Sequence, residues 1–177
     1  MNYSGIIKCD VANGEGIRLS LFVSGCQFHC PDCFNQDSQN YNYGDEYTSS
    51  TTEEIINYIK QDTISGLSLL GGDPLWQKPE GLIHLINLCQ KVHELHKNVW
   101  IWSGFTWEQI FASCEYQDYD ETKALRQELI MNSDVWIDGT FKKDKKDVTL
   151  KWRGSSNQRV IDVKKTLEKG EIVLYEK

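Results

Sequence analysis

Short apolar runs alternate along the chain with longer segments in which apolar residues recur at helical spacing. The short runs are typical of buried strands, and they fall at Ile17–Val23, Gly66–Leu70, Asn98–Trp102 and Asp134–Ile137. The periodic segments predict helices over 51 to about 61, 79 to about 97, 107–113 and 121–131. Strands that alternate with helices in this way favour a parallel sheet with right-handed crossovers.

Start signals support three of these helices. Thr51 and Glu54 form a capping-box pattern, Pro79 suits the first turn of a helix, and Thr106 can cap the helix that follows it. Between the elements we predict a polar loop at 41–50 and an acidic, tyrosine-containing loop at 114–121. The apolar run Glu171–Tyr175 indicates an additional edge strand.

The number of predicted strands limits the architecture. A closed barrel of eight strand–helix units needs about 250 residues, whereas this chain has 177. We therefore predict an α/β fold with a partial (β/α) barrel or an open sheet, mostly parallel, with helices outside. No internal repeat or linker interrupts the pattern, so residues 1–177 are expected to form a single domain.

Small and polar residues follow each predicted strand. In parallel sheets, chemistry collects at the carboxyl ends of the strands. These ends carry Ser24–Cys26, Gly71–Pro74, Ser103–Gly104 and Asp138–Gly139. We expect the four ends to lie on one rim and to line one cleft.

Composition limits which binding partners and which cellular compartment we expect. The net charge of −7 lacks the basic footprint that grips phosphate backbones, so no nucleic acid partner is expected. No run approaches the roughly 18 apolar residues of a membrane span, and the N-terminus does not resemble a signal peptide. We therefore expect a cytoplasmic protein. Six cysteines in a reducing compartment indicate metal or redox chemistry more than disulfides.

Three of these cysteines stand in one short loop. Cys26, Cys30 and Cys33 have the spacing C-x3-C-x2-C directly after the first predicted strand. A structural zinc site takes four ligands, and His29 would have to complete the set inside the same loop. A thiol oxidoreductase on Cys30 and Cys33 leaves Cys26 unexplained. A 4Fe-4S cluster held by three thiolates leaves one iron open to a non-protein ligand.

The spacing C-x3-C-x2-C, followed by "GGDP" after the second predicted strand, resembles the radical S-adenosylmethionine superfamily. The resemblance implies a 4Fe-4S cluster on Cys26, Cys30 and Cys33, which are then both the metal ligands and the catalytic residues. It also implies S-adenosylmethionine on the open iron. The glycines of GGDP let the backbone approach the cofactor, and exposed carbonyls can accept from its ammonium group.

The same resemblance implies further cofactor contacts. The superfamily often places an aromatic residue just before the third cysteine, where this chain has Asp32. Phe34, with Phe28 behind it, is the natural substitute for stacking on adenine. The residues expected at the cofactor are Asp32, Cys33, Phe34, Gly71, Gly72, Asp73 and Ser103. Asp138 is a further candidate for a contact to a cofactor hydroxyl.

Motifs over roughly residues 3–162 resemble one subfamily more closely, the activating proteins of anaerobic ribonucleoside-triphosphate reductases. The motifs are "NGEGIR", "LFVSGCQFHCPDCFN", "LLGGDPL", "IWSGFTWE", "DVWIDGTF" and "KWRGSSNQRVID". In that subfamily the motif around the third cysteine is usually C-P-x-C-aromatic-Asn, which this chain matches with "CPDCFN". The resemblance implies reductive cleavage of S-adenosylmethionine and a glycyl radical on the large subunit of the reductase. A flavodoxin-type protein would supply the electron.

Alternatives remain at this point. Another small radical S-adenosylmethionine enzyme, such as a formate-lyase activase or a carboxy-deazaguanine synthase, shares the first two motifs. A zinc or thiol redox module is a different class. The sequence also leaves open whether "RGSSNQR" contacts the cofactor or a partner, or only ties down the C-terminal part of the chain.

Overall fold

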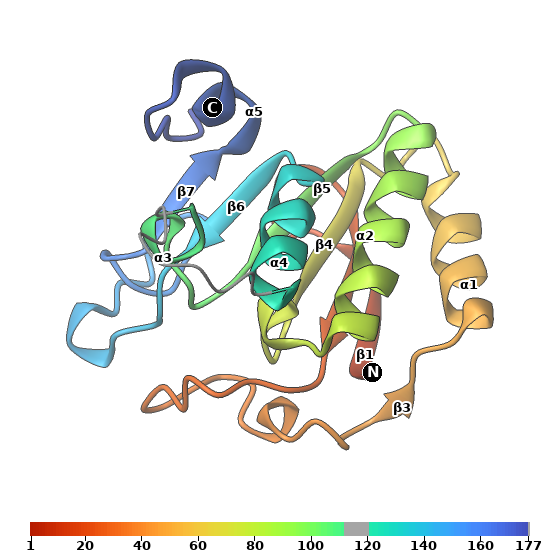
Figure 1. Ribbon diagram of the computed structural model, residues 1–177, viewed down its shortest axis with the longest axis horizontal. Coiled ribbons are helices and arrows are strands. Elements are labelled where there is room, and N and C mark those ends of the chain that lie inside the picture. Colours follow the sequence, from red (N-terminus) through yellow and green to blue (C-terminus); the bar gives the residue numbers. More distant parts are fainter. Residues whose placement is uncertain (112–120, 177) are drawn as a thin grey trace.

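The computed structural model of the protein describes residues 1–111 and 121–176, which form one sheet with helices packed against it (Figure 1). The strands in this part of the chain are β1 Asn2–Asp10, β2 Arg18–Val23, β3 Asp45–Glu46, β4 Gly66–Gly71, β5 Asn98–Trp102, β6 Val135–Asp138 and β7 Arg159–Asp162. The α-helices are α1 Ser49–Ile59, α2 Pro79–Glu94, α3 Trp107–Phe111, α4 Glu121–Met131 and α5 Val163–Lys169. Short 3₁₀ turns lie at Asp37–Gln39, Pro74–Trp76 and Lys143–Lys145.

The sheet is open and has the strand order β3-β1-β2-β4-β5-β6-β7. Its centre is parallel, since β2 pairs with β4, β4 with β5, and β5 with β6 in the same direction. The pairs β1–β2, β1–β3 and β6–β7 are antiparallel. The predicted α/β class and its parallel core are confirmed, while the strands β1, β3 and β7 were not predicted.

Helices α1, α2 and α4 lie next to one another over one face of the sheet (Figure 1). The stripe of α2 that faces the strands is apolar and buried, and Cys89 is one of its members. Burial of such a stripe supplies most of the stability of a helix of this length.

Polar groups are buried where the parallel strands begin. Arg18, the first residue of β2, is fully buried and stacks on Trp100, with its guanidinium carbon 5.3 Å from the ring centroid. Its Nε donates to Ser68 at 2.7 Å, and its Nη1 donates to the Asn98 side chain at 2.6 Å. Arg18 therefore links the beginnings of β2, β4 and β5 from within the predicted buried strand.

Helix α1 begins earlier than predicted. Thr48 is extended, and its hydroxyl accepts from the Thr51 N–H, while the Thr51 hydroxyl accepts from the Thr48 N–H. The capping box is therefore Thr48 with Thr51, and the predicted pair Thr51 and Glu54 is wrong. A short hydroxyl side chain at the third helical position serves as well as the expected glutamate.

The edge strand predicted at Glu171–Tyr175 does not form a regular strand. Within the described residues the segment runs along β7 through an isolated antiparallel bridge between Leu174 and Ile161. Two backbone hydrogen bonds accompany the bridge, from the Asp162 N–H to the Val173 carbonyl and from the Tyr175 N–H to the Val160 carbonyl. The edge of the sheet is β7, which is antiparallel to β6 and comes from the chain just after "RGSSNQR". Most of the acidic loop predicted at 114–121 lies outside the described residues. No helix in the described part of the chain is long and apolar enough to cross a bilayer.

Candidate cofactor site at the carboxyl ends of the parallel strands

The carboxyl ends of β2, β4, β5 and β6 line one cavity of about 460 Å³. This confirms the expectation that the four strand ends share a cleft. All but one of the residues that the sequence assigned to the cluster or to the cofactor border this cavity, namely Cys26, Cys30, Asp32, Cys33, Phe34, Gly71, Gly72, Asp73 and Ser103. The exception is Asp138. The segment 139–158 provides the opposite wall.

The cysteine loop leaves β2 and is held where it starts. The Gly25 N–H donates to the Ser38 carbonyl at 2.7 Å, and the Cys26 N–H donates to the Gln39 carbonyl at 3.1 Å. Within the loop, Asp32 has a φ of 57° and His29 has a φ of 47°, in the left-handed region. Strand β2 and the returning segment therefore fix the base of the loop, and its tip turns tightly.

The three loop cysteines are free thiols and half-buried. Burial and the nearby Asp73 carboxylate raise the pKa of Cys26 to about 12. Burial also raises the pKa of Cys30. Metal binding must therefore displace these protons, which makes cluster assembly pH-dependent. A raised pKa at Cys30 is the opposite of what a reactive redox thiol needs, so the oxidoreductase hypothesis loses support.

The structure does not provide the four close ligands that a zinc site requires among the described residues. His29 faces Gln39, with 3.0 Å between its Nδ1 and the Gln39 side-chain oxygen. Among residues 1–111 and 121–176, no three side chains of His, Cys, Asp or Glu lie together closely enough to bind a single metal ion. A cluster of four irons distributes its thiolates over separate irons, so its donors are spaced more widely than those of one zinc ion. The donor set of three cysteines around a cavity therefore fits a cluster better than zinc.

The two glycines of GGDP are required by the packing of the protein itself. Gly71 has a φ of +109°, and a Cβ there would lie 2.6 Å from the Val23 carbonyl oxygen. A Cβ on Gly72 would lie 2.6 Å from the carbonyl oxygens of both Gly25 and Ser38. The sequence explained these glycines by approach of a cofactor. The structure adds that they let β4 approach the cysteine loop, so a side chain at Gly72 would disturb the loop as well.

Asp73 and Ser103 bind each other. Asp73 is 2% exposed, and its carboxylate accepts from the Ser103 hydroxyl at 2.9 and 3.0 Å and from the Gly104 N–H at 2.7 Å. It also accepts from the Leu75 N–H at 2.8 Å. Burial raises the pKa of Asp73 to about 6, against the lowering effect of these donors. The carboxylate therefore joins the ends of β4 and β5 and fixes the cavity wall.

The aromatic residues of the cysteine loop have different surroundings. The Phe34 side chain borders the cavity and is 98% exposed, so one of its faces is available for stacking. Phe28 is not behind Phe34. It packs edge-on against Trp76 and Phe105, with ring centroids 5.7 and 5.0 Å away, and so anchors the loop to the neighbouring strand ends. Asp32 pairs with Lys143 at 2.6 Å, which joins the loop to the opposite wall.

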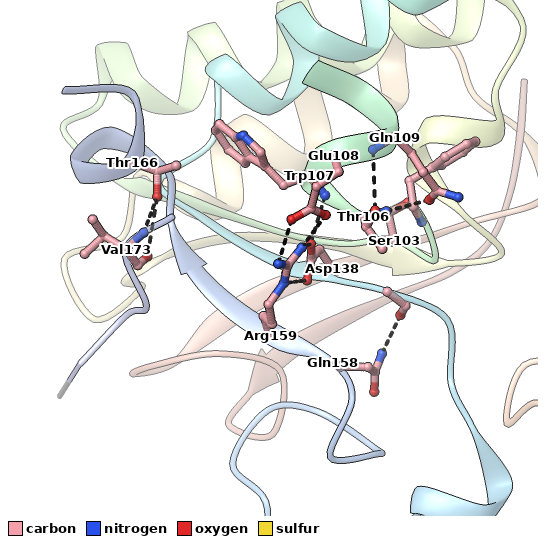
Figure 2. A network of polar contacts seen from close by, with 12 residues as sticks. Ser103, Thr106, Trp107, Glu108, Gln109, Asp138, Gln158, Arg159, Thr166 and Val173 are labelled. Carbon is pink, nitrogen blue, oxygen red and sulfur yellow. Dashed lines mark hydrogen bonds and ion pairs between the residues drawn. The ribbon is translucent and has the colours of Figure 1, made fainter. Parts of the chain in front are cut away.

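Asp138 has no free carboxylate oxygen to offer a cofactor. It is 1% exposed, and its oxygens accept from the Arg159 guanidinium and from the Trp107 N–H (Figure 2). Arg159 also donates to both carboxylate oxygens of Glu108 at 2.9 Å, and this contact lowers the pKa of Glu108 to about 2. The sequence-based hypothesis of a hydroxyl contact is not supported, because this network uses the carboxylate to join β6, β7 and α3.

Most of the polar residues in "RGSSNQR" tie the segment to the end of β6. The Gln158 side chain accepts from the Gly154 N–H at 2.9 Å and donates to the Gly139 carbonyl at 3.0 Å. The Asn157 side chain donates to the Thr140 carbonyl at 2.8 Å. These bonds close the wall of the cavity. The sequence did not predict these hydrogen bonds, because the segment has neither helical nor strand periodicity.

The comparisons with known proteins identify the class of domain. The family model described as "4Fe-4S single cluster domain" matches residues 12–161, so the chain is a member of that class of iron–sulfur domains. The anaerobic ribonucleoside-triphosphate reductase-activating protein of Escherichia coli (strain K12) is 36% identical over 164 residues, covering 90% of this chain and 97% of that protein. The protein of the same name from Enterobacteria phage T4 is 37% identical over 161 residues, covering 90% of this chain and 93% of the phage protein. The chain belongs to the family of anaerobic ribonucleoside-triphosphate reductase-activating proteins.

Proposed function

We propose that the protein activates an anaerobic ribonucleoside-triphosphate reductase by forming a glycyl radical on its large subunit. The observation that carries this proposal is the convergence of three free cysteines and the GGDP turn on one cavity at the strand ends. The names of the relatives specify the reductase as the target. The substrate is then a folded protein that presents one glycine to the cavity.

Cys26, Cys30 and Cys33 would hold a 4Fe-4S cluster, and S-adenosylmethionine would bind beside it. When bound, the cluster supplies the electron that splits the cofactor into methionine and a 5′-deoxyadenosyl fragment, which takes a hydrogen from the glycine Cα. In this proposal, the carbonyls of Gly71 and Gly72 accept from the methionine ammonium, whereas the Asp73 carbonyl already accepts from the Trp76 N–H and the Gln77 side chain. Phe34 offers an exposed ring to adenine.

The remaining cofactor residues have supporting roles in the proposal. Ser103 and Asp73 hold the rim through their mutual hydrogen bonds. Asp32 keeps the cysteine loop against Lys143. Cys33 acts as a cluster ligand and as a neighbour of the cofactor. We also infer a single domain over 1–177, curvature of the sheet towards a partial barrel, a cytoplasmic location and a flavodoxin-type electron donor.

Anaerobic reconstitution with iron and sulfide tests the proposal. The protein should become coloured, and after reduction it should convert S-adenosylmethionine to 5′-deoxyadenosine. Addition of the reductase large subunit should give a glycyl radical signal in electron paramagnetic resonance. A reductase whose radical-bearing glycine is replaced by alanine is the matched control and should give no signal.

Two results would contradict the proposal. Colourless protein with one zinc per chain after reconstitution would favour a zinc module. Cleavage of the cofactor with radical formation on a formate lyase, but none on the reductase, would favour a different activase within the same superfamily.

A further inference from the structure

Among the described residues that border the cavity, one cationic side chain has a buried N–H without a hydrogen-bond partner. Arg153 borders the cavity, and its Nε is buried without a hydrogen-bond acceptor among the described residues. Buried N–H groups in folded proteins are almost always paired, and an unpaired one costs about 1–3 kcal/mol. An acceptor that is not part of the described chain is therefore expected at this position.

The carboxylates that border the cavity in the described part of the chain do not provide that acceptor. Asp32 pairs with Lys143, and the Asp73 carboxylate is buried among its own donors. Asp147 is close enough for Arg153 to help lower its pKa, but its Oδ1 accepts from the Thr149 N–H at 2.9 Å and from the Thr149 hydroxyl at 2.6 Å.

The second cation at the cavity differs from Arg153 in its exposure. Lys146 also borders the cavity, but its side chain is exposed, so water can solvate the ammonium. Arg153 is half-buried, and its Nε is shielded from solvent. Of these two cations, Arg153 is therefore the one that an anionic ligand would stabilise more by binding.

The backbone on both sides of Arg153 is held in place. Trp152, the preceding residue, has a φ of 62°, and its carbonyl accepts from the Trp102 indole N–H at 2.7 Å. On the other side, the Gln158 side chain accepts from the Gly154 N–H. These bonds hold the Cα of Arg153 beside the cavity, so the side chain starts from a fixed point of the cavity wall.

We propose that Arg153 binds the carboxylate of the methionine part of S-adenosylmethionine. A guanidinium presents its donors in a planar fork that matches a carboxylate. The proposed cofactor carries one carboxylate. This single negative group can pair with the single cationic side chain whose N–H has no acceptor among the described residues. This inference rests on the proposed function and assigns a ligand-binding role to the first residue of "RGSSNQR".

Binding of the cofactor to cluster-loaded protein, measured by equilibrium dialysis without a reductant, tests the assignment in the absence of turnover. Arg153→Gln should weaken binding of S-adenosylmethionine about 10- to 100-fold, the range for a hydrogen bond to a charged group. Arg153→Lys should lose less, because the charge remains. Lys151→Gln is the matched control, since Lys151 is exposed in the same segment and does not border the cavity.

Decarboxylated S-adenosylmethionine separates recognition of the carboxylate from a general loss of the site. It should bind the wild type and Arg153→Gln equally, because the group that Arg153 contacts is missing from the ligand. Other contacts of the carboxylate affect the wild type and Arg153→Gln equally. The ratio of the two affinities for each ligand therefore reports only the contribution of Arg153. Iron content and circular dichroism should be the same in all variants.

Three results would overturn the assignment. Unchanged affinity of Arg153→Gln for S-adenosylmethionine would show that Arg153 does not bind the cofactor. Equal losses with both ligands would show a structural role only. Unchanged cofactor binding with weaker binding of the reductase would place Arg153 at the partner. If the wild type itself forms a cluster but binds no S-adenosylmethionine, the proposed function fails together with this assignment.

Discussion

Cys26, Cys30 and Cys33 share one loop but differ in their surroundings. Cys26 stands next to the end of β2 and near Asp73, whereas Cys30 and Cys33 lie in the turn of the loop. In the proposed cluster, each of them would be the protein ligand of one iron. A site with three protein ligands has no spare donor.

Replacement of any one loop cysteine by alanine should abolish cluster assembly. We expect cluster content to fall by more than about tenfold, because even outer contacts of a metal site contribute about 10- to 100-fold in affinity. Iron and sulfide analysis after reconstitution measures this. Cys9→Ala is the control, since Cys9 is exposed and contacts Tyr58 away from the cavity. A loop variant with a full cluster would remove that cysteine from the ligand set.

Gly72→Ala should damage the cysteine loop as well as the cofactor site. The new Cβ would overlap backbone oxygens of Gly25 and Ser38, which cannot move as a flexible side chain could. We expect a loss of about 1–3 kcal/mol in the free energy of unfolding and lower cluster content. Gly5→Ala is the matched control, because no atom lies within 4 Å of a Cβ built there. Full cluster content in Gly72→Ala would show that the loop adapts.

At the scale of elements, the ends of β6, β7 and α3 meet in the Asp138–Arg159–Glu108 network (Figure 2). The two acidic residues differ in burial. The Asp138 side chain is 1% exposed and that of Glu108 is 60% exposed. The network holds α3 against the sheet, beside the Gly139 end of the cavity.

Arg159→Leu should be strongly destabilising, because it leaves the Asp138 charge buried without its cation. The expected loss is about 3–5 kcal/mol, the usual result of breaking a buried pair from one side. Glu108→Gln should cost at most about 1 kcal/mol, since water screens the exposed partner. Urea unfolding of the protein measures both. Equal losses in the two variants would contradict the different roles assigned to the two carboxylates.

The Arg159–Glu108 pair should also give the stability a pH dependence. The pKa of Glu108 is lowered from 4.5 to about 2 in the folded protein, so the unfolded state binds this proton more readily. The stabilisation is complete above pH 4.5 and is lost as the pH falls through 2. Unfolding free energies across this range should fall less steeply in Glu108→Gln than in the wild type. Identical slopes would exclude Glu108 as a contributor.

At the scale of the whole molecule, the amino and carboxyl ends of the parallel strands have different structural roles. The carboxyl ends form the cavity, whereas the amino ends are joined by buried Arg18. Arg18 also donates to the Leu67 carbonyl at 2.6 Å, so its removal leaves several buried acceptors unpaired. The amino ends therefore contribute to stability, and the carboxyl ends to binding.

Arg18→Met should separate stability from binding. We expect a loss of at least about 2 kcal/mol in the free energy of unfolding, because each unpaired buried group costs about 1–3 kcal/mol. The folded fraction of the cluster-loaded variant should bind S-adenosylmethionine with unchanged affinity, measured by equilibrium dialysis. Weaker binding by the folded fraction would show that the two ends of the sheet are coupled.

The sequence by itself determined the central part of the fold and supplied the hypothesis of a cluster in the cysteine loop. The strands predicted at Gly66–Leu70 and Asn98–Trp102 and the helix predicted at 121–131 followed from the apolar pattern, because burial of a face or a stripe imposes that pattern. The structure has them at Gly66–Gly71, Asn98–Trp102 and Glu121–Met131. The spacing of Cys26, Cys30 and Cys33 was enough to suggest the cluster, because ligands within one short loop are local in sequence.

Only the tertiary structure decided how distant segments complete the site. The edge strands β1 and β7 depend on pairing with neighbours far along the chain, so their own residues carried no clear signal. The packing of Gly72 against Gly25 and the partners of Asp138 also join residues that are remote in sequence. The orphaned donor of Arg153 appears only when all its neighbours are placed, because whether a hydrogen bond is satisfied depends on the surrounding atoms and not on the residue type.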